Sequence, residues 1–142
     1  GTLNVVSKNS EAADTALSQI LHIVRGIYSM PPSNGTLIVE TILGDEALTK
    51  DWKIELEEMR TRIKSLRELL TSKLNGKQSI DRDFSFIEEQ KGMFSYLGLS
   101  KEQVLVLREK YSIYMLDSSR VNIAGINQDN INYLADSIEA VL

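Results

Sequence analysis

The chain has 142 residues, a net charge of −4 and no cysteine, and 42% of its residues are hydrophobic. This composition predicts a soluble globular protein and excludes disulfides and cysteine-based zinc sites. The acidic charge argues against nucleic acid as a partner, and no apolar run reaches the roughly 18 residues that a membrane span requires.

The N-terminal part predicts a strand followed by a helix. Leu3, Val5 and Val6 indicate a short strand, which opens the chain without a methionine or a leader, as we expect of a chain that starts midway in a longer one. Asn9 or Ser10 can cap the helix that follows. Apolar residues recur on one face of this helix, at Ala13, Leu17, Ile20, Val24 and Ile27.

Pro31 and Pro32 end that helix because proline fixes φ and lacks an N–H donor. The segment TLIVETIL, residues 36–43, then leaves two structures open. Its β-branched residues favour a strand, whereas the spacing of its leucines and isoleucines also suits one face of a helix.

The longest predicted element is a helix from about Asp45 to Leu74, ended by Asn75 and Gly76. About 30 residues at 1.5 Å each give roughly 45 Å of helix, long enough to connect two bodies. Glu58 and Arg62 are spaced for an i,i+4 ion pair on its exposed side. The predicted apolar stripe comprises Trp52, Leu56, Met59, Ile63, Leu66 and Leu70.

Beyond residue 80 the pattern changes to short strands and two helices. The segment SKEQ, residues 100–103, is a capping box that opens a helix through about Lys110. A last helix begins near Gln128, with the apolar stripe Ile131, Leu134, Ala135, Ile138 and Val141. Strands are predicted in FSFIEE, GMFSYLG, SIYML and RVNIAG. The aromatic residues that alternate there are mostly expected in the core, namely Phe84, Phe86, Phe94 and Tyr96.

Chemistry-bearing motifs are few. There is no glycine-rich phosphate loop and no histidine–carboxylate cluster with metal-ligand spacing. His22 is the sole histidine, which excludes a dyad of two histidines, and it is expected to be structural. Arg25 lies in the last turns of its helix, and Arg120 stands at the head of an apolar strand. Because arginine keeps its charge, Arg120 must either reach water or meet an anion.

The segments QILHIVRGIYSMPPSNGTLIVETIL, KGMFSYLGLSKEQVLVLREKYSIYML and SSRVNIAGINQDNINYLADSI carry a family resemblance. In this order and spacing they resemble the C-terminal part of an aspartate aminotransferase, a fold-type I enzyme that uses pyridoxal phosphate. The resemblance implies an α/β fragment that is α+β in its C-terminal part. Residues 1–45 would end the large cofactor-binding domain, residues 46–75 would form a long connecting helix, and residues 76–142 would form the small domain.

The resemblance also implies roles for three residues. Arg120 corresponds to the arginine that pairs with the substrate α-carboxylate. Arg25 corresponds to the arginine that binds the distal carboxylate, reaching into the active site of the neighbouring subunit of a homodimer. Phe94 corresponds to an aromatic residue that helps to close the pocket. No catalytic residue is implied within the chain, because the Schiff-base lysine is expected before Gly1, so the chain alone is expected to be inactive.

The resemblance therefore implies a cytoplasmic enzyme that transfers an amino group between aspartate or glutamate and a 2-oxo acid through pyridoxal phosphate. Met30 stands where the family usually has asparagine, and Ser119 where it usually has glycine. Two alternatives stay open: an aminotransferase for aromatic amino acids, and a non-catalytic interaction or regulatory module of the same fold.

Overall fold

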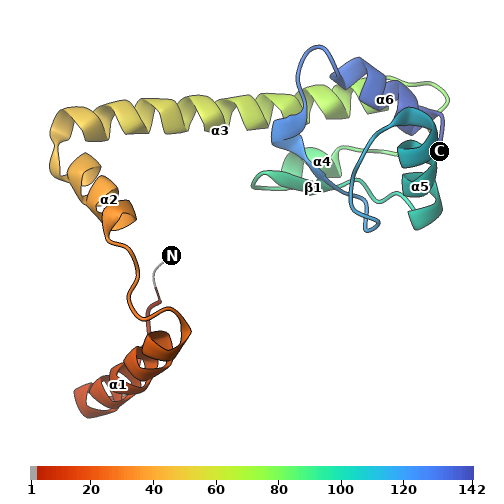
Figure 1. Cartoon of the computed structure of the whole chain (residues 1–142). Coiled ribbons are helices and arrows are strands. Elements are labelled where there is room, and N and C mark those ends of the chain that lie inside the picture. The colour runs from red at the N-terminus through yellow and green to blue at the C-terminus, as the bar shows by residue number, and fades with distance from the viewer. Residues whose placement is uncertain (1–2) are drawn as a thin grey trace. The chain divides into compact units, whose positions relative to one another are not determined.

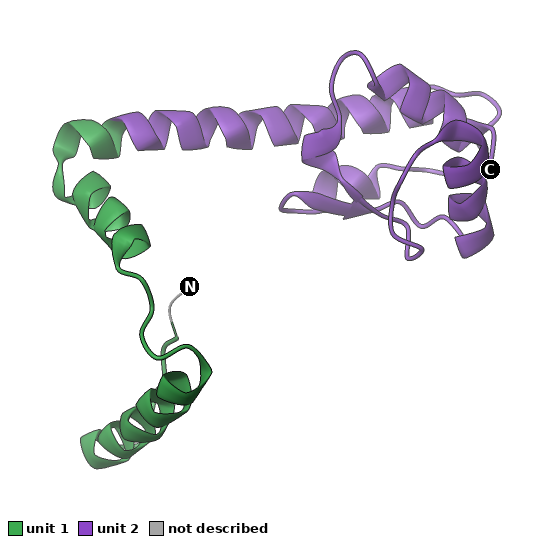
Figure 2. Cartoon of the chain, in the orientation of Figure 1, with its two compact units in different colours: residues 1–50 green, residues 51–142 purple. Residues whose placement is uncertain are grey.

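The computed structural model describes residues 3–142, which form several helices and a two-stranded sheet (Figure 1). The chain divides into two compact units, Gly1–Lys50 and Asp51–Leu142 (Figure 2). Within the described range, no helix combines the length and the apolar character needed to cross a membrane.

The first unit is helical. Helix α1 spans Ser10–Ile27, and the predicted cap is confirmed, because the Asn9 side chain accepts a hydrogen bond from the Ala12 N–H at 2.9 Å. The segment TLIVETIL, for which strand and helix were both left open, belongs to helix α2, Asn34–Gly44. The predicted strand at residues 3–6 is wrong, since these residues adopt no regular structure. A strand needs a paired neighbour, and the two strands of the sheet pair only with each other.

The helices of the first unit enclose no core. None of the residues of α1 or α2 is buried, and apolar side chains such as Leu17, Ile27 and Ile38 are exposed. Burial of apolar area is the main favourable contribution to folding. These helices therefore lack most of the packing that stabilises a helix pair in water.

Helix α3, Glu46–Asn75, confirms the predicted long helix, but only the second part of its stripe is buried. Leu66 and Leu70 lie in the core of the second unit, whereas Trp52, Leu56 and Met59 are exposed. The side chains buried along α3 are Leu66, Arg67, Leu70, Thr71 and Leu74.

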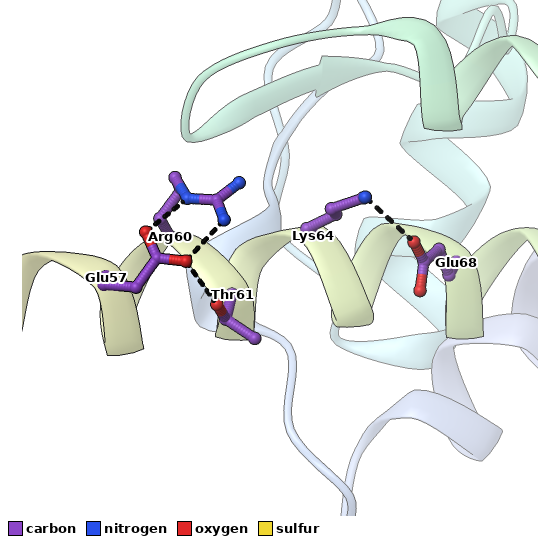
Figure 3. A network of polar contacts seen from close by, with 5 residues as sticks. All are labelled: Glu57, Arg60, Thr61, Lys64 and Glu68. Atoms are coloured by element: carbon purple, nitrogen blue, oxygen red, sulfur yellow. Dashed lines mark hydrogen bonds and ion pairs between the residues drawn. The ribbon is translucent and has the colours of Figure 1, made fainter.

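The predicted pair of Glu58 with Arg62 is wrong. Figure 3 shows the ion pairs that form along α3 instead. Glu57 accepts two hydrogen bonds from Arg60, and the Lys64 Nζ lies 3.9 Å from the Glu68 carboxylate. Arg62 points elsewhere, because its guanidinium donates to backbone carbonyls further along the chain.

The second unit has a closed hydrophobic core. It is built from the C-terminal half of α3, the short helix α4 (Phe86–Glu89), α5 (Lys101–Tyr111) and α6 (Ile131–Glu139). Completely buried side chains of this core include Leu70, Leu74, Phe84, Ile87, Leu97, Val104, Leu107, Ile123 and Ile138.

Two sequence predictions for these helices are confirmed. Ser100 and Gln103 form the capping box of α5, with the Gln103 N–H donating to the Ser100 Oγ and the Ser100 N–H donating to the Gln103 Oε1. The predicted stripe of α6 faces the core: Ile131, Leu134, Ala135 and Ile138 are buried and Val141 is half-buried.

Two strand predictions in the second unit are wrong. FSFIEE ends in the helical turn α4. SIYML, residues 112–116, forms no strand, because Ser112 takes the left-handed conformation at φ 53° and the Ile113 N–H bonds back to the Leu107 carbonyl at 3.1 Å. The left-handed residue ends α5, and the chain continues as a loop. The remaining two segments supply β1 (Phe94–Tyr96) and β2 (Arg120–Asn122), followed by the 3₁₀ turn η1 (Ile123–Gly125).

The loop before β2 is tied back to α5 by charge. Arg108 donates to Asp117 at 2.8 Å and to the Met115 carbonyl at 3.3 Å, and the Lys101 Nζ lies 3.4 Å from Asp117. The hydrogen bond from Arg108, supported by Lys101, holds the pKa of Asp117 below its usual range.

This ion cluster predicts an acid-dependent contribution to stability. A carboxyl group whose pKa is lowered by folding stabilises the protein fully above its unfolded pKa of about 4, and loses that contribution as pH falls through the folded pKa. We expect Asp117→Asn to lower the urea midpoint of unfolding at neutral pH, and we expect this difference from the wild type to be smaller at pH 3, where part of the contribution has been lost. An equal difference at both pH values would contradict this assignment.

Candidate functional site

The two-stranded sheet of β1 and β2 places Arg120 and Phe94 on the same face. The strands are antiparallel, with Phe94 opposite Asn122 and Tyr96 opposite Arg120. Arg120 and Phe94 are therefore diagonal neighbours, within reach of long side chains. The Arg120 guanidinium lies over the Phe94 ring, 4.6 Å from its centroid.

The guanidinium of Arg120 keeps its hydrogen-bonding capacity free. The residue is half-buried, and within residues 3–142 it forms no ion pair with a carboxylate and donates no side-chain hydrogen bond. Its contact with Phe94 is a cation–π interaction, typically worth about 0.5–1 kcal/mol when exposed. A stacked guanidinium still presents its N–H groups at its edge, where their fork matches a carboxylate in bidentate geometry.

The aromatic residues of this region are buried only in part, contrary to the expectation that most belong to the core. Phe84 is buried and Phe86 half-buried, but Phe94 and Tyr96 are exposed. The side chain that β1 turns inward is Ser95, at 1% exposure. An exposed aromatic face beside an uncompensated arginine is therefore the main feature of the outer side of the sheet.

Ser119, directly before Arg120, occupies a backbone conformation that favours glycine. Its φ is 66°, and its side chain is completely buried. The Oγ accepts a hydrogen bond from the Leu99 N–H at 3.0 Å, and the carbonyl accepts one from the Leu97 N–H at 3.1 Å. Serine thus replaces the usual glycine at the conformational cost of a left-handed residue, and its hydroxyl satisfies a buried amide in return.

Two arginines of α3 hold the backbone around this face: Arg67, for which no role was predicted, and Arg62, whose predicted partner was Glu58. Arg67 is 3% exposed and donates four hydrogen bonds to residues 87–95. Arg62 is exposed and donates to the carbonyls of Ala124, at 3.3 Å, and Ile126, at 3.0 Å.

The burial of Arg67 could have been predicted from the sequence. It lies four residues after Ile63 and three before Leu70, so it shares the face of the apolar stripe. A charged residue at such a position, with apolar residues on both sides, predicts a buried charge that needs several hydrogen-bond partners.

Arg25 belongs to the first unit, in the last turn of α1, and is exposed. Within the described residues it forms no ion pair. After α1 the chain turns sharply, with Ser29 at φ 69° and the Met30 N–H donating to the Tyr28 carbonyl at 2.8 Å. Met30 is exposed, and no contact explains why methionine replaces asparagine there. His22 is also exposed.

The comparisons with known proteins identify the family. The model for class I and II aminotransferases matches residues 4–138. The chain belongs to this family. Over all of its 142 residues it is 46% identical to the aspartate aminotransferase of Haemophilus influenzae, and it covers 36% of that protein. Over the same length it is 42% identical to the aromatic-amino-acid aminotransferase of Escherichia coli, of which it also covers 36%. This aminotransferase chain thus spans about a third of the length of these relatives.

Solved structures confirm the expected fold class, a portion of a fold-type I aminotransferase. The mitochondrial aspartate aminotransferase of Trypanosoma brucei aligns with a TM-score of 0.86 at 38% identity, covering 95% of this chain and 35% of that one. The aromatic-amino-acid aminotransferase of Burkholderia pseudomallei, described as covalently bound to pyridoxal phosphate, aligns with a TM-score of 0.87 at 41% identity, covering 96% and 34%.

The described lysines of this aminotransferase chain lie in surroundings unlike those that activate a Schiff-base lysine. Such a lysine is activated by burial or by neighbouring positive charge, which lowers its pKa. Among residues 3–142 every lysine is exposed except Lys77, which is half-buried. Lys77 pairs with Asp136 and Glu139, and these carboxylates raise its pKa. Within the same range no group of three potential ligands is placed to hold a metal ion.

The hydrogen bond of Ser119 generates a prediction for the whole protein. Ser119→Ala keeps the left-handed strain and leaves the Leu99 amide without its partner, so we expect a loss of about 1–3 kcal/mol in the free energy of unfolding. Ser119→Gly loses the same bond but relieves the strain, so its loss is expected to be smaller by roughly 1 kcal/mol.

Thermal unfolding and hydrogen exchange of the Leu99 amide measure these effects. Exchange at Leu99 is expected to be faster in both variants. Wild-type exchange at Leu99 in the alanine variant would show that the Ser119 hydroxyl does not hold this amide.

Proposed function

We propose that the whole protein is an aspartate aminotransferase, which transfers an amino group between aspartate or glutamate and a 2-oxo acid. The observation that carries this proposal is the half-buried Arg120, which stacks on Phe94 and pairs with no carboxylate among the described residues. The aspartate aminotransferases among its relatives support the substrate class.

In this proposal Arg120 binds the α-carboxylate that every amino-acid substrate carries. Its planar fork accepts the two carboxylate oxygens in parallel, which fixes the orientation of the attached Cα as well as its position. Phe94 covers one face of the guanidinium and so limits the directions from which a carboxylate can approach. Lysine would not replace Arg120, because an ammonium group binds as a point charge.

Arg25 binds the distal carboxylate of aspartate or glutamate in the same proposal, from the neighbouring subunit of a homodimer. Its support is the resemblance of the segment IVRGIYSMPPSNG, together with the exposed position of Arg25 at the end of α1. The unburied apolar side chains of α1 and α2 also fit an arrangement in which other parts of the protein cover them.

The proposed cofactor is pyridoxal phosphate, as in the Burkholderia pseudomallei relative. Because the lysines of residues 3–142 lack the surroundings that activate a Schiff-base lysine, we assign this lysine to a part of the whole protein outside these residues. The proposed compartment of the enzyme is the cytoplasm. The residues described here would contribute to substrate binding.

An aromatic-amino-acid aminotransferase is the second candidate. It is favoured by the relatives from Escherichia coli, at 42% identity, and Burkholderia pseudomallei, with a TM-score of 0.87. Arg120 would keep its role because aromatic amino acids also carry an α-carboxylate. Arg25 therefore distinguishes the two candidates.

The cofactor assignment predicts the labelling pattern of the isolated chain. After incubation with pyridoxal phosphate and reduction with borohydride, we expect only scattered, substoichiometric labelling of exposed lysines, because burial or neighbouring positive charge activates none of them. Peptide mass spectrometry locates the label. Stoichiometric labelling of a single lysine would contradict the assignment.

The substrate assignment predicts different losses for the two arginines in the full-length enzyme. Truncating one partner of a buried charge pair costs about 2–5 kcal/mol, or roughly 30-fold to several thousand-fold in kcat/KM. We expect Arg120→Ala to lower kcat/KM for aspartate and phenylalanine alike. Arg25→Ala is expected to cause this loss for aspartate and little loss for phenylalanine, which has no distal carboxylate.

Steady-state kinetics of both variants with both substrates measure these losses. Equal losses for the two substrates in Arg25→Ala would remove Arg25 from the specificity role. A wild-type enzyme that prefers phenylalanine over aspartate would favour the second candidate.

A further inference from the structure

Arg67 makes an unusually complete set of hydrogen bonds for a buried arginine. One terminal nitrogen donates to the Ile87 carbonyl at 3.0 Å and the Ser95 Oγ at 2.7 Å. The other donates to the carbonyls of Gly92 and Phe94, each at 2.8 Å. A single guanidinium thus connects α3 to α4, to the turn before β1 and to β1 itself.

The charge of Arg67 has no counterion among the described residues. Its acceptors are all neutral, and burial lowers its pKa. Removing a charge from water is costly, and apolar residues of similar volume often stabilise a protein as well as a buried charge does. Stability alone therefore does not account for an arginine at this position. The geometry of the planar fork does, because it fixes several acceptors relative to one another.

The acceptors of Arg67 determine the path of the segment that carries Phe94. The Gly92 and Phe94 carbonyls lie on either side of Met93, and Gly92 adopts φ 86°, a conformation that suits glycine. With Ser95 bound as well, the backbone is held immediately before and after the Phe94 side chain.

The network continues from Ser95 toward the residue opposite Arg120. The Ser95 hydroxyl donates to the Gln90 Oε1 at 2.5 Å, and the same oxygen accepts the Tyr96 N–H at 3.0 Å. The Gln90 amide group donates to the Tyr96 carbonyl at 3.2 Å. Tyr96 pairs with Arg120 across the two-stranded sheet. Both neighbours of Arg120 on this face, Phe94 and Tyr96, are thus held by a network that starts at Arg67.

We propose that Arg67 is a positioning residue for recognition of the substrate α-carboxylate: it holds Phe94, whose ring in turn holds the guanidinium of Arg120. This inference rests on the proposed function, because it concerns the binding of a substrate by Arg120. Arg67 itself is buried behind β1 and does not touch the substrate.

A double-mutant cycle in the full-length holoenzyme tests the inference. The variants are Arg67→Met and Phe94→Ala, singly and combined, with kcat and KM measured for aspartate and phenylalanine. We expect Arg67→Met to lower kcat/KM by about 10- to 100-fold, since small misplacements of binding groups have effects of this size. The loss is expected mainly in KM and equally for both substrates, because both carry the α-carboxylate.

The combined variant separates positioning from stability. If Arg67 acts through the Phe94 ring, Arg67→Met in the Phe94→Ala background should cost less than about twofold more in kcat/KM. Its effect on the melting temperature should persist in that background. Equal losses of kcat/KM with and without the ring, or a loss confined to aspartate, would overturn the inference.

Two further variants complete the design. Arg60→Met removes an exposed arginine of α3 whose side chain, among residues 3–142, donates hydrogen bonds only to Glu57, so it should leave kcat/KM unchanged (Figure 3). Arg67→Lys keeps the charge but not the planar fork, and it decides the question if Arg67→Met does not fold. A folded Arg67→Lys enzyme with wild-type KM would overturn the inference.

Arg120→Ala distinguishes the two possible failures. If Arg120→Ala retains wild-type activity, or if the wild type transaminates neither substrate, the proposed function fails and the inference falls with it. If Arg120→Ala is impaired while the Arg67 variants keep wild-type KM, only the role of Arg67 is refuted.

Discussion

The four hydrogen bonds of the buried Arg67 guanidinium are the constraint on which the two-stranded sheet depends. An isolated pair of three-residue strands is marginal in water. Here Arg67 satisfies acceptors in β1 and in the turn before it, while the Ile123 N–H, at the start of η1 directly after β2, donates to the Met93 carbonyl at 2.8 Å. The helix α3 therefore provides both an apolar surface for the core and a polar anchor for the sheet.

This anchor decides which side chains of β1 face outward. Successive side chains of a strand point to opposite faces, so drawing Ser95 inward to Arg67 turns Phe94 and Tyr96 outward. Arg120, opposite Tyr96, lies on the same outer face and stacks on Phe94. The exposed aromatic surface and the uncompensated charge beside it thus have one physical origin, a buried polar network behind the strand.

The sequence predicted the helices well because their signals are local. The Asn9 cap, the Ser100–Gln103 capping box and the stripe of α6 each lie within a few residues, and the structure confirms all of them. Strands were predicted poorly, because residues 3–6 and 112–116 have strand-like composition but no partner strand. The strand pattern left the orientation of Phe94 open, although the resemblance implied a place at the pocket, because this orientation depends on Arg67, which is distant in the sequence.

The two candidate substrate arginines differ in what fixes them. Arg120 lies on a two-stranded sheet anchored to a closed core, so its stacking partner and its free N–H groups are established within residues 51–142. Arg25 ends a helix with no buried residue, so the surroundings of its guanidinium depend on whatever covers that helix. Under the proposed function, the group common to all substrates would be recognised by a preformed site, whereas the group that distinguishes substrates would be recognised by a site completed on assembly. Specificity could then change through the contacts around Arg25 without disturbing the binding of the α-carboxylate.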